Sequence, residues 1–259
     1  MASTGFTTTR GRKWPQMAGQ MPADARRALA AVCALHQRPS ASSKGSKTAS
    51  KTSGVTGLIL AGGQSRRMGR DKAHLPWGSA TLIARVIETL RPVTEELLVV
   101  ARDARAFAGL GARVVEDLVP GAHALGGLYT GLTLAAHERC FVCACDNPFL
   151  SAPLVRFLYE QLDGGDLVIP KTASGLQPLH AAYARSALPA IQEQLRQERW
   201  DLCALAPKLR TRIIEPEQWR PFDHGGRSFF NLNTPADYAA ARQLAAEGMR
   251  CATSESRRL

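Results

Sequence analysis

The stretch from residue 55 to residue 72 constrains the fold of this chain more than any other. It begins with a mostly apolar run, Val55 to Leu60, which is the pattern of a parallel strand buried on both faces. Gly62 and Gly63 follow almost at once, and a backbone without Cβ can adopt positive φ and approach a ligand closely. Such a loop after a buried strand is typical of open α/β sheets, which bind ligands at the carboxyl ends of their strands.

The loop is also strongly basic, because Arg66, Arg67, Arg70 and Lys72 follow the two glycines. Convergent backbone N–H groups and nearby cations favour a phosphate ligand. The spacing matches neither the Walker A loop nor the dinucleotide fingerprint. A plain glycine turn with solvated basic residues is the alternative, since glycine is common in turns. The density of positive charge favours a phosphate-binding loop.

Strand and helix patterns alternate along the rest of the chain. The expected strands are 96–101, 113–115, 140–144, 166–170, 177–184 and 211–214. The expected helices are 81–90, 126–137, 152–162, 187–197 and 235–246, the last with Thr234 as N-cap and Pro235 at its first position. Repeated β-then-α units predict a single three-layer α/β domain, with a Rossmann-like, mostly parallel sheet and helices on both faces.

The two ends of the chain differ in composition from this body. Residues 1–54 are expected to form a basic, disordered N-terminal extension, because 39–54 are rich in Ser, Lys and Gly. A transit peptide, or a true start at Met17 or Met21, are the alternatives there. Residues 55–248 are expected to form the folded domain, and 249–259 a flexible C-terminal tail.

The formal net charge of +11 belongs mainly to those ends. Residues 1–54 hold nine Lys or Arg and one acid, Asp24, whereas the body is nearly neutral. We therefore expect no nucleic-acid partner. No apolar run approaches the ~18 residues of a membrane span, so no membrane association is expected either.

Six cysteines occur, without the spacing of a zinc site. Cys140, Cys143 and Cys145 lie in one apolar run, where small buried thiols are expected. No secretory segment is visible, so we expect reduced thiols and a cytoplasmic protein.

Asp146 is the best candidate for a metal ligand. It ends the apolar run 140–145, which places it at the carboxyl tip of a buried strand beside the glycine loop. Magnesium prefers oxygen ligands and takes only one or two carboxylates. The alternative is an aspartate that caps the helix after Ser151.

The run L-A-G-G-x-S-x-R-M-G-x-D-K, from Leu60 to Lys72, resembles the signature of nucleotidyltransferases that activate sugars and cofactors. Within that superfamily it is most similar to the bacterial molybdenum cofactor guanylyltransferases, and later motifs extend the resemblance over roughly residues 56–244. Those motifs are Cys145-Asp146-Asn147-Pro148, Glu116-Asp117, Gln177-Pro178-Leu179 and Asn231-Leu232-Asn233-Thr234-Pro235.

The resemblance implies roles for these residues. Leu60, Ala61, Gly62 and Gly63 would contact the nucleotide through their backbone, and Asp117 would contact it as well. Lys72 would reach the triphosphate, a task that suits a compact point charge. Asp146 would bind Mg²⁺. Arg67 would help to neutralise pyrophosphate, with a solvated surface position as its alternative.

The acceptor side is implied by three further residues. Gln177 would line it, and Asn231 and Asn233 would lie near the acceptor or the metal. The alternative for the two asparagines is that they only help to cap the last helix.

Two segments depart from the family pattern. The family's V-N-A-N-R is here Val99-Val100-Ala101-Arg102-Asp103, and its G-P-L-A-G turn is His123-Ala124-Leu125-Gly126-Gly127. Both departures bear on base or sugar recognition rather than on the transfer chemistry. A glycine at position 62 fits guanylyl relatives better than cytidylyl relatives, which tend to have L-A-A-G.

The expected activity is transfer of GMP from GTP to molybdenum-loaded molybdopterin, with Mg²⁺ as cofactor and pyrophosphate as leaving group. An already anionic phosphate attacks, so no general base and no covalent intermediate are required. Molybdenum-insertion proteins and client molybdoenzymes are the expected protein partners. Two alternatives stay open: a cytidylyltransferase or sugar-phosphate nucleotidyltransferase, and a non-catalytic nucleotide-binding or nucleic-acid-binding protein.

Overall fold

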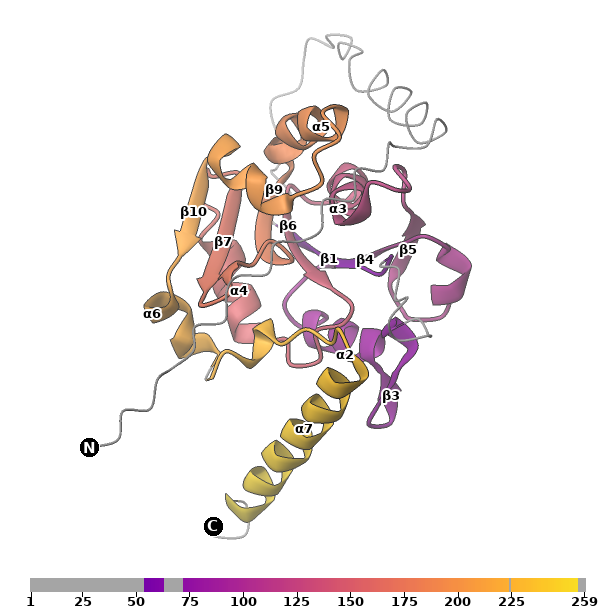
Figure 1. The fold of residues 1–259 in the computed structure, drawn as a ribbon, viewed down its shortest axis with the longest axis vertical. Helices are drawn as coiled ribbons and strands as arrows, with labels where there is room; N and C mark the ends of the chain where they lie inside the picture. The colour runs from indigo at the N-terminus through magenta and orange to yellow at the C-terminus, as the bar shows by residue number, and fades with distance from the viewer. Residues whose placement is uncertain (1–53, 63–71, 224, 256–259) are drawn as a thin grey trace, which may run out of the picture.

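The protein is described by a computed structural model, which covers residues 54–62, 72–223 and 225–255. Its centre is a sheet whose strands run in the order β10-β7-β9-β6-β1-β4-β5, with β8 paired to β7 (Figure 1). The strands of this sheet are β1 (Val55–Leu60), β4 (Glu96–Ala101), β5 (Arg113–Glu116), β6 (Arg139–Ala144), β7 (Leu167–Thr172), β8 (Gly175–Leu176), β9 (His180–Ala184) and β10 (Thr211–Ile214). A separate hairpin pairs β2 (Pro76–Trp77) with β3 (Ala80–Thr81).

The α-helices are α2 (Leu82–Leu90), α3 (His123–Leu134), α4 (Ala152–Glu160), α5 (Leu188–Arg196), α6 (Pro216–Trp219) and α7 (Pro235–Glu255). The 3₁₀ turns are η1 (Lys72–His74), η2 (Ala104–Phe107), η3 (Arg185–Ala187), η4 (Leu202–Lys208), η5 (Arg220–Phe222) and η6 (Arg227–Phe229). In Figure 1, α3 and α5 cover one side of the sheet and α2 and α4 the other. The predicted three-layer architecture is therefore confirmed.

Strand β1 lies at the centre of the sheet, where it pairs in parallel with β4 and β6. Successive side chains of a strand point to opposite faces of the sheet, so the side chains of β1 alternate between the two hydrophobic cores on either side of it. Leu58 packs with α3 and α5, whereas Ile59 packs with α2 and α4. In the main sheet β9 is antiparallel to its neighbours β6 and β7, and the short β8 is antiparallel to β7, whereas the other strand pairs are parallel. "Mostly parallel" was therefore the correct expectation.

The helix boundaries depend on local capping. Thr81 accepts a hydrogen bond from the N–H of Ala84 at the start of α2, and Ser151 accepts one from Leu154 at the start of α4. Such caps satisfy N–H groups that the first turn of a helix leaves without partners.

The boundaries of three predicted elements were wrong by three residues or more. The helix expected at 126–137 is α3, His123–Leu134, and it stops there because Ala135 leaves the helical conformation (φ −59°, ψ 142°). Residues 177–179 are not part of a strand, because Gln177 donates its N–H to Pro170 O in a turn and Pro178 has no N–H to give a sheet. The last helix does not end at residue 246, and α7 continues to Glu255 through most of the segment expected to be a flexible tail. Gly248 alone does not stop it, since one glycine costs a helix only about 1 kcal/mol.

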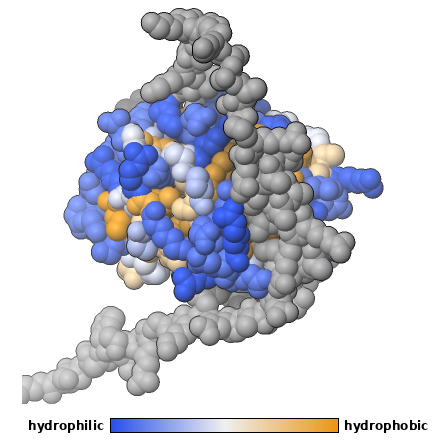
Figure 2. All heavy atoms as spheres, turned by 90° about the horizontal axis from the view of Figure 1, so that it is seen from above, coloured by the Kyte–Doolittle hydropathy of each residue, from blue (hydrophilic) through white to orange (hydrophobic). Residues whose placement is uncertain are grey.

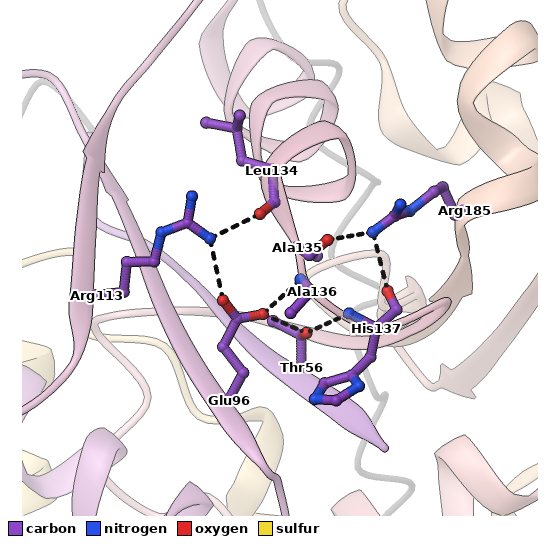
Figure 3. Close-up of polar contacts among 8 residues, drawn as sticks. All are labelled: Thr56, Glu96, Arg113, Leu134, Ala135, Ala136, His137 and Arg185. Carbon is purple, nitrogen blue, oxygen red and sulfur yellow. Dashed lines mark hydrogen bonds and ion pairs between the residues drawn. The ribbon is translucent and has the colours of Figure 1, made fainter. Parts of the chain in front are cut away.

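The amino ends of the strands are tied together by a polar network (Figure 3). The Glu96 carboxylate accepts hydrogen bonds from Thr56 Oγ1, from the Ala136 N–H and from Arg113 Nη1. Arg113 and Arg185 donate to the carbonyls of Leu134 and Ala135, at the end of α3. A positively charged side chain is stabilising at the carboxyl end of a helix, where main-chain carbonyls lack partners within the helix. The polar side chains at this edge of the sheet therefore form hydrogen bonds within the protein and stabilise the fold.

The described surface is largely polar. Figure 2 shows hydrophilic residues over much of the visible described surface, with hydrophobic residues in smaller areas between them. Ile213 and Phe222 are the large hydrophobic side chains that the described residues expose. Within the described residues, no helix is both long enough and apolar enough to cross a membrane.

Candidate active site

The carboxyl ends of four parallel strands meet at one edge of the sheet. Main-chain hydrogen bonds extend the ladders past the strand ends, from Ala61 N to Val100 O, from Cys145 N to Leu60 O and from Asp117 N to Ala101 O. The predicted residues Leu60, Ala61, Gly62, Asp117 and Asp146 therefore share this edge. It is also a topological switch point, because β4 and β6 lie on opposite sides of β1.

A lysine and two oxygen donors meet at this edge. Lys72 Nζ lies 3.1 Å from Asp146 Oδ2 and 3.2 Å from Asn233 Oδ1. Lys72 begins the turn η1, and the next residue, Ala73, is fully buried in the core beside α2. Both side chains of the ion pair are mostly covered, with 17% and 15% of their surface exposed. Three segments distant in sequence therefore build one charged centre.

Asn233 is held in place by the start of α7. The carboxylate of Asp237 accepts hydrogen bonds from the N–H groups of Asn233 (2.9 Å) and Thr234 (2.8 Å). In return, Thr234 Oγ1 accepts the N–H of Asp237 at 3.1 Å, so Thr234 is the N-cap, as predicted. Partial burial opposes ionisation of Asp237, but these hydrogen bonds and the charge of Lys72 lower its pKa. The cap thereby fixes the backbone that presents Asn233.

Asp146 is not the cap of α4, because Ser151 has that role. Its side chain is directed to Lys72 instead, and its backbone carbonyl accepts the N–H of Leu232 at 3.2 Å. The alternative interpretation of Asp146 as a capping residue is therefore wrong. The Leu232 contact also joins the end of β6 to the segment that carries Asn233.

The donor set at this edge fits a magnesium ion. Asp146 Oδ2 and Asn233 Oδ1 are both hard oxygen donors, and both already face one cation, the ammonium of Lys72. Among the residues that the structure describes, no cluster of three or more His, Cys, Asp or Glu could hold a metal alone. Magnesium usually takes few protein carboxylates and completes its shell with water and substrate phosphates. Asp146 and Asn233 would hold such an ion.

Asp117 has an internal role. Its Oδ1 accepts hydrogen bonds from the N–H of Val119 at 3.0 Å and from Thr130 Oγ1 at 2.8 Å. Burial raises the pKa of Asp117, although these two hydrogen bonds oppose the rise. The carboxylate therefore organises the turn from β5 into α3, and its predicted contact with a nucleotide stays a prediction.

The other predicted site residues that the structure describes are not among the side chains that meet at Lys72. Gln177 Nε2 donates to Thr172 Oγ1 and Ser174 Oγ, within the β7–β8 hairpin. Asn231 is exposed and directly precedes Leu232, which contacts Asp146. Gly62 is exposed, and the nearest atom to a Cβ built on it would be the backbone nitrogen of Arg102, 3.8 Å away. Gly63 and Arg67 lie outside the described residues.

Comparisons with known proteins identify the family of the chain. Residues 57–210, more than half of the chain, match the MobA-like NTP transferase domain. The chain belongs to the MobA-like NTP transferase family. It is therefore a nucleotidyltransferase, and the matched range contains Lys72, Asp117 and Asp146.

Named members of the family include close relatives of the chain. It is 39% identical over 191 residues to a probable molybdenum cofactor guanylyltransferase of Pelotomaculum thermopropionicum, covering 74% of this chain and 93% of that one. A molybdenum cofactor guanylyltransferase of Desulfosudis oleivorans is 36% identical, covering 72% and 94%. The solved structure of molybdopterin-guanine dinucleotide biosynthesis protein A from Archaeoglobus fulgidus is 29% identical with a TM-score of 0.66, covering 74% and 99%.

The MobA-like match ends at residue 210, whereas Asn233 and its support lie beyond it. Sequence reasoning found Asn233 through its motif but missed Asp237. The spacing Thr234-x-x-Asp237 is the signal that could have found it, because an acid at the third helical position completes a capping box. Asn147 and His180, which lie buried behind Asp146, were missed as well.

Proposed function

We propose that the protein transfers GMP from GTP to the terminal phosphate of molybdenum-loaded molybdopterin, with release of pyrophosphate. One observation carries this proposal: Lys72, Asp146 and Asn233 converge at the carboxyl edge of β1 and β6. The names of the relatives, which are molybdenum cofactor guanylyltransferases, support the choice of GTP and of the pterin acceptor.

The residues divide the work of the transfer. The Lys72 ammonium would bind the triphosphate and neutralise charge that develops on the leaving pyrophosphate. Asp146 and Asn233 would hold Mg²⁺, which, when bound, shields the phosphates and helps to keep attacking and leaving oxygens in line. The backbone of Leu60–Gly62 would position the nucleotide beside β4. The acceptor phosphate is anionic already, so the chain needs no residue that removes a proton from it.

The acceptor would enter from the side of Gln177 and Asn231. Both residues belong to segments that adjoin the strand ends, namely the turn before β9 and the segment before α7. A pterin that is prone to oxidation favours direct transfer from molybdenum-insertion proteins and to client molybdoenzymes in the cytoplasm. Residues 55–248 are nearly neutral and so lack the excess positive charge that binds nucleic acid. We therefore propose that the protein binds these protein partners and not nucleic acid.

Nucleotide selection tests the proposal. Purified protein is incubated with Mg²⁺ and molybdenum-loaded molybdopterin, and the initial rate of pyrophosphate release is measured with GTP, CTP and ATP in turn. We expect turnover with GTP alone, and its loss in Asp146→Ala. Turnover with CTP alone would assign the chain to the cytidylyltransferases and show that Gly62 does not select guanine. Release that persists in Asp146→Ala would refute the assigned role of Asp146.

A further inference from the structure

A buried polar pair lies directly behind Asp146. Asn147 and His180 each expose only 2% of their surface, and Asn147 Nδ2 lies 3.3 Å from His180 Nδ1. Asn147 is the residue after Asp146. His180 is the first residue of β9 and is paired with Cys143 in the neighbouring strand β6. The pair therefore connects the turn that presents Asp146 to the neighbouring strand.

The imidazole also contacts the segment that presents Asn233. Its ring lies 4.8 Å from the ring of Phe229 and 5.3 Å, edge to face, from that of Phe141. Phe229 ends η6, and Leu232, three residues later, donates its N–H to the Asp146 carbonyl. His180 is thus in contact with both segments that supply oxygen donors to the site.

Packing alone does not account for a histidine at this position. Burial lowers the pKa of His180 to about 3, so the ring is neutral and has one N–H and one acceptor nitrogen. Within the described part of the chain, Asn147 Oδ1 and His180 Nε2 have no hydrogen-bond partner. Buried polar atoms without partners are costly, whereas an apolar ring of similar size would avoid that cost between Phe141 and Phe229. The Asn147 contact is what the imidazole supplies and an apolar ring does not.

We propose that His180 is a positioning residue for the nucleotidyl transfer. It fixes the Asn147 amide on one side and the Phe229 ring on the other, and so holds Asp146 and Asn233 at the separation that their shared cation requires. The proposal rests on the proposed function, since it assigns His180 to the same metal and nucleotide centre. Mutation of a residue that orients a metal ligand, without itself binding the metal, typically lowers metal affinity or activity by about 10- to 100-fold.

Two variants of the full chain separate positioning from packing. His180→Phe keeps a ring between Phe141 and Phe229 but removes the polar contact with Asn147. His180→Asn keeps a polar group near the position of Nδ1, and the β9 backbone stays paired with β6 in either variant. Thr56→Val is the matched control, because Thr56 is fully buried in the same sheet and loses a 2.7 Å hydrogen bond to Glu96 at the opposite edge.

The readouts are Mn²⁺ affinity by electron paramagnetic resonance, with GTP and again with CTP, together with kcat, the KM for GTP and Tm. We expect Mn²⁺ affinity and kcat of His180→Phe to fall by about 10-fold or more, with the KM for GTP nearly unchanged. His180→Asn is expected to recover most of both losses. Thr56→Val is expected to lower Tm without changing either quantity.

The opposing results are equally specific. Wild-type Mn²⁺ affinity and kcat in His180→Phe would overturn the proposal. Equal losses in His180→Phe and Thr56→Val would overturn it too, because both would then reflect stability alone. If the wild type turned over no GTP, the proposed function would fail. The Mn²⁺ measurements would still decide the role of His180, and an absence of any Mn²⁺ binding by the wild type would refute it.

Discussion

The Lys72 ammonium is the side chain on which the site depends most directly. It lies 3.1 Å from a carboxylate oxygen of Asp146 and 3.2 Å from the amide oxygen of Asn233. We predict that Lys72→Ala lowers kcat/KM for GTP by about 100- to 1,000-fold, the loss typical of one electrostatic contact to a transition state. Lys171→Ala is the control, because Lys171 forms an exposed ion pair with Glu215. Steady-state kinetics measures kcat/KM for both variants. Equal values of kcat/KM in Lys72→Ala and Lys171→Ala would contradict the account.

The strand cysteines give a second prediction at the scale of single residues. Cys140 and Cys143 are fully buried, as expected, and burial raises the pKa of Cys140 to about 12 and that of Cys143 further. A thiol reagent reacts with the thiolate. At pH 8 the native protein should therefore leave both unmodified, whereas urea-unfolded protein should react at both, as peptide mapping after labelling would show. Equal labelling rates in the native and unfolded states would refute the buried β6 strand.

At the scale of elements, α3 packs closely on β1. A Cβ added at Gly131 would lie 2.2 Å from Leu58 Cδ2, whereas one added at Gly127 would lie 3.2 Å from Leu60 Cδ2. Both substitutions gain about 1 kcal/mol of helix propensity. Overpacking costs about 1–3 kcal/mol and applies mainly to Gly131→Ala. We predict that urea denaturation finds Gly131→Ala less stable than Gly127→Ala by at least about 1 kcal/mol. The reverse order would contradict the close approach of α3 to β1.

The junction between β7 and β10 depends on Asp166. Its carboxylate accepts hydrogen bonds from Arg210 Nε at 3.0 Å, from Arg210 Nη2 at 2.8 Å and from Ser186 Oγ. The Arg210 guanidinium holds the pKa of Asp166 well below its usual range, despite the opposing effect of burial. An acid with a lowered pKa in the folded state stabilises the protein at any pH above its pKa in the unfolded state, which is about 3.9 for Asp. This stabilisation is lost as the pH falls through the folded-state pKa.

We therefore predict a pH-dependent effect of Asp166→Asn. At pH 7 the variant should lose about 1–3 kcal/mol of unfolding free energy, because a charged buried acceptor is removed. The difference from the wild type should stay constant between pH 5 and pH 8 and shrink below about pH 4. Urea denaturation across this range measures it. A difference that grows as the pH falls would contradict the lowered pKa of Asp166.

At the scale of the whole molecule, the sequence predicted the order of elements better than the contacts between them. β1, β4 and β10 have the predicted bounds, because each is a short run rich in β-branched or aliphatic residues between breaks. The edge that carries Asp146 was also predictable, since parallel strands end together. The contact between Lys72 and Asn233, 161 residues away in the chain, was not predicted, because the family motif placed Asn233 only near the acceptor or the metal.

Other features were hidden for physical reasons. A histidine at the start of an apolar strand does not reveal that its partner is Asn147, because that contact depends on how β9 lies against β6. The length of α7 was underestimated, since one glycine lowers helix propensity without ending a helix. The turn at 177–179 was mistaken for strand because its main-chain hydrogen bonds, from Gln177 N to Pro170 O and from His180 N to Gln177 O, depend on how the chain folds back after β7.

The measurement that tests the central claim most directly follows the α-phosphate of the nucleotide. GTP labelled at that phosphate is incubated with the full chain, Mg²⁺ and molybdenum-loaded molybdopterin, and the products are separated. The convergence of Lys72, Asp146 and Asn233 predicts that the label leaves GTP and appears in a pterin–guanine dinucleotide, in an amount equal to the pyrophosphate released. Label that stays in GTP, or that is released as free GMP, would contradict the account.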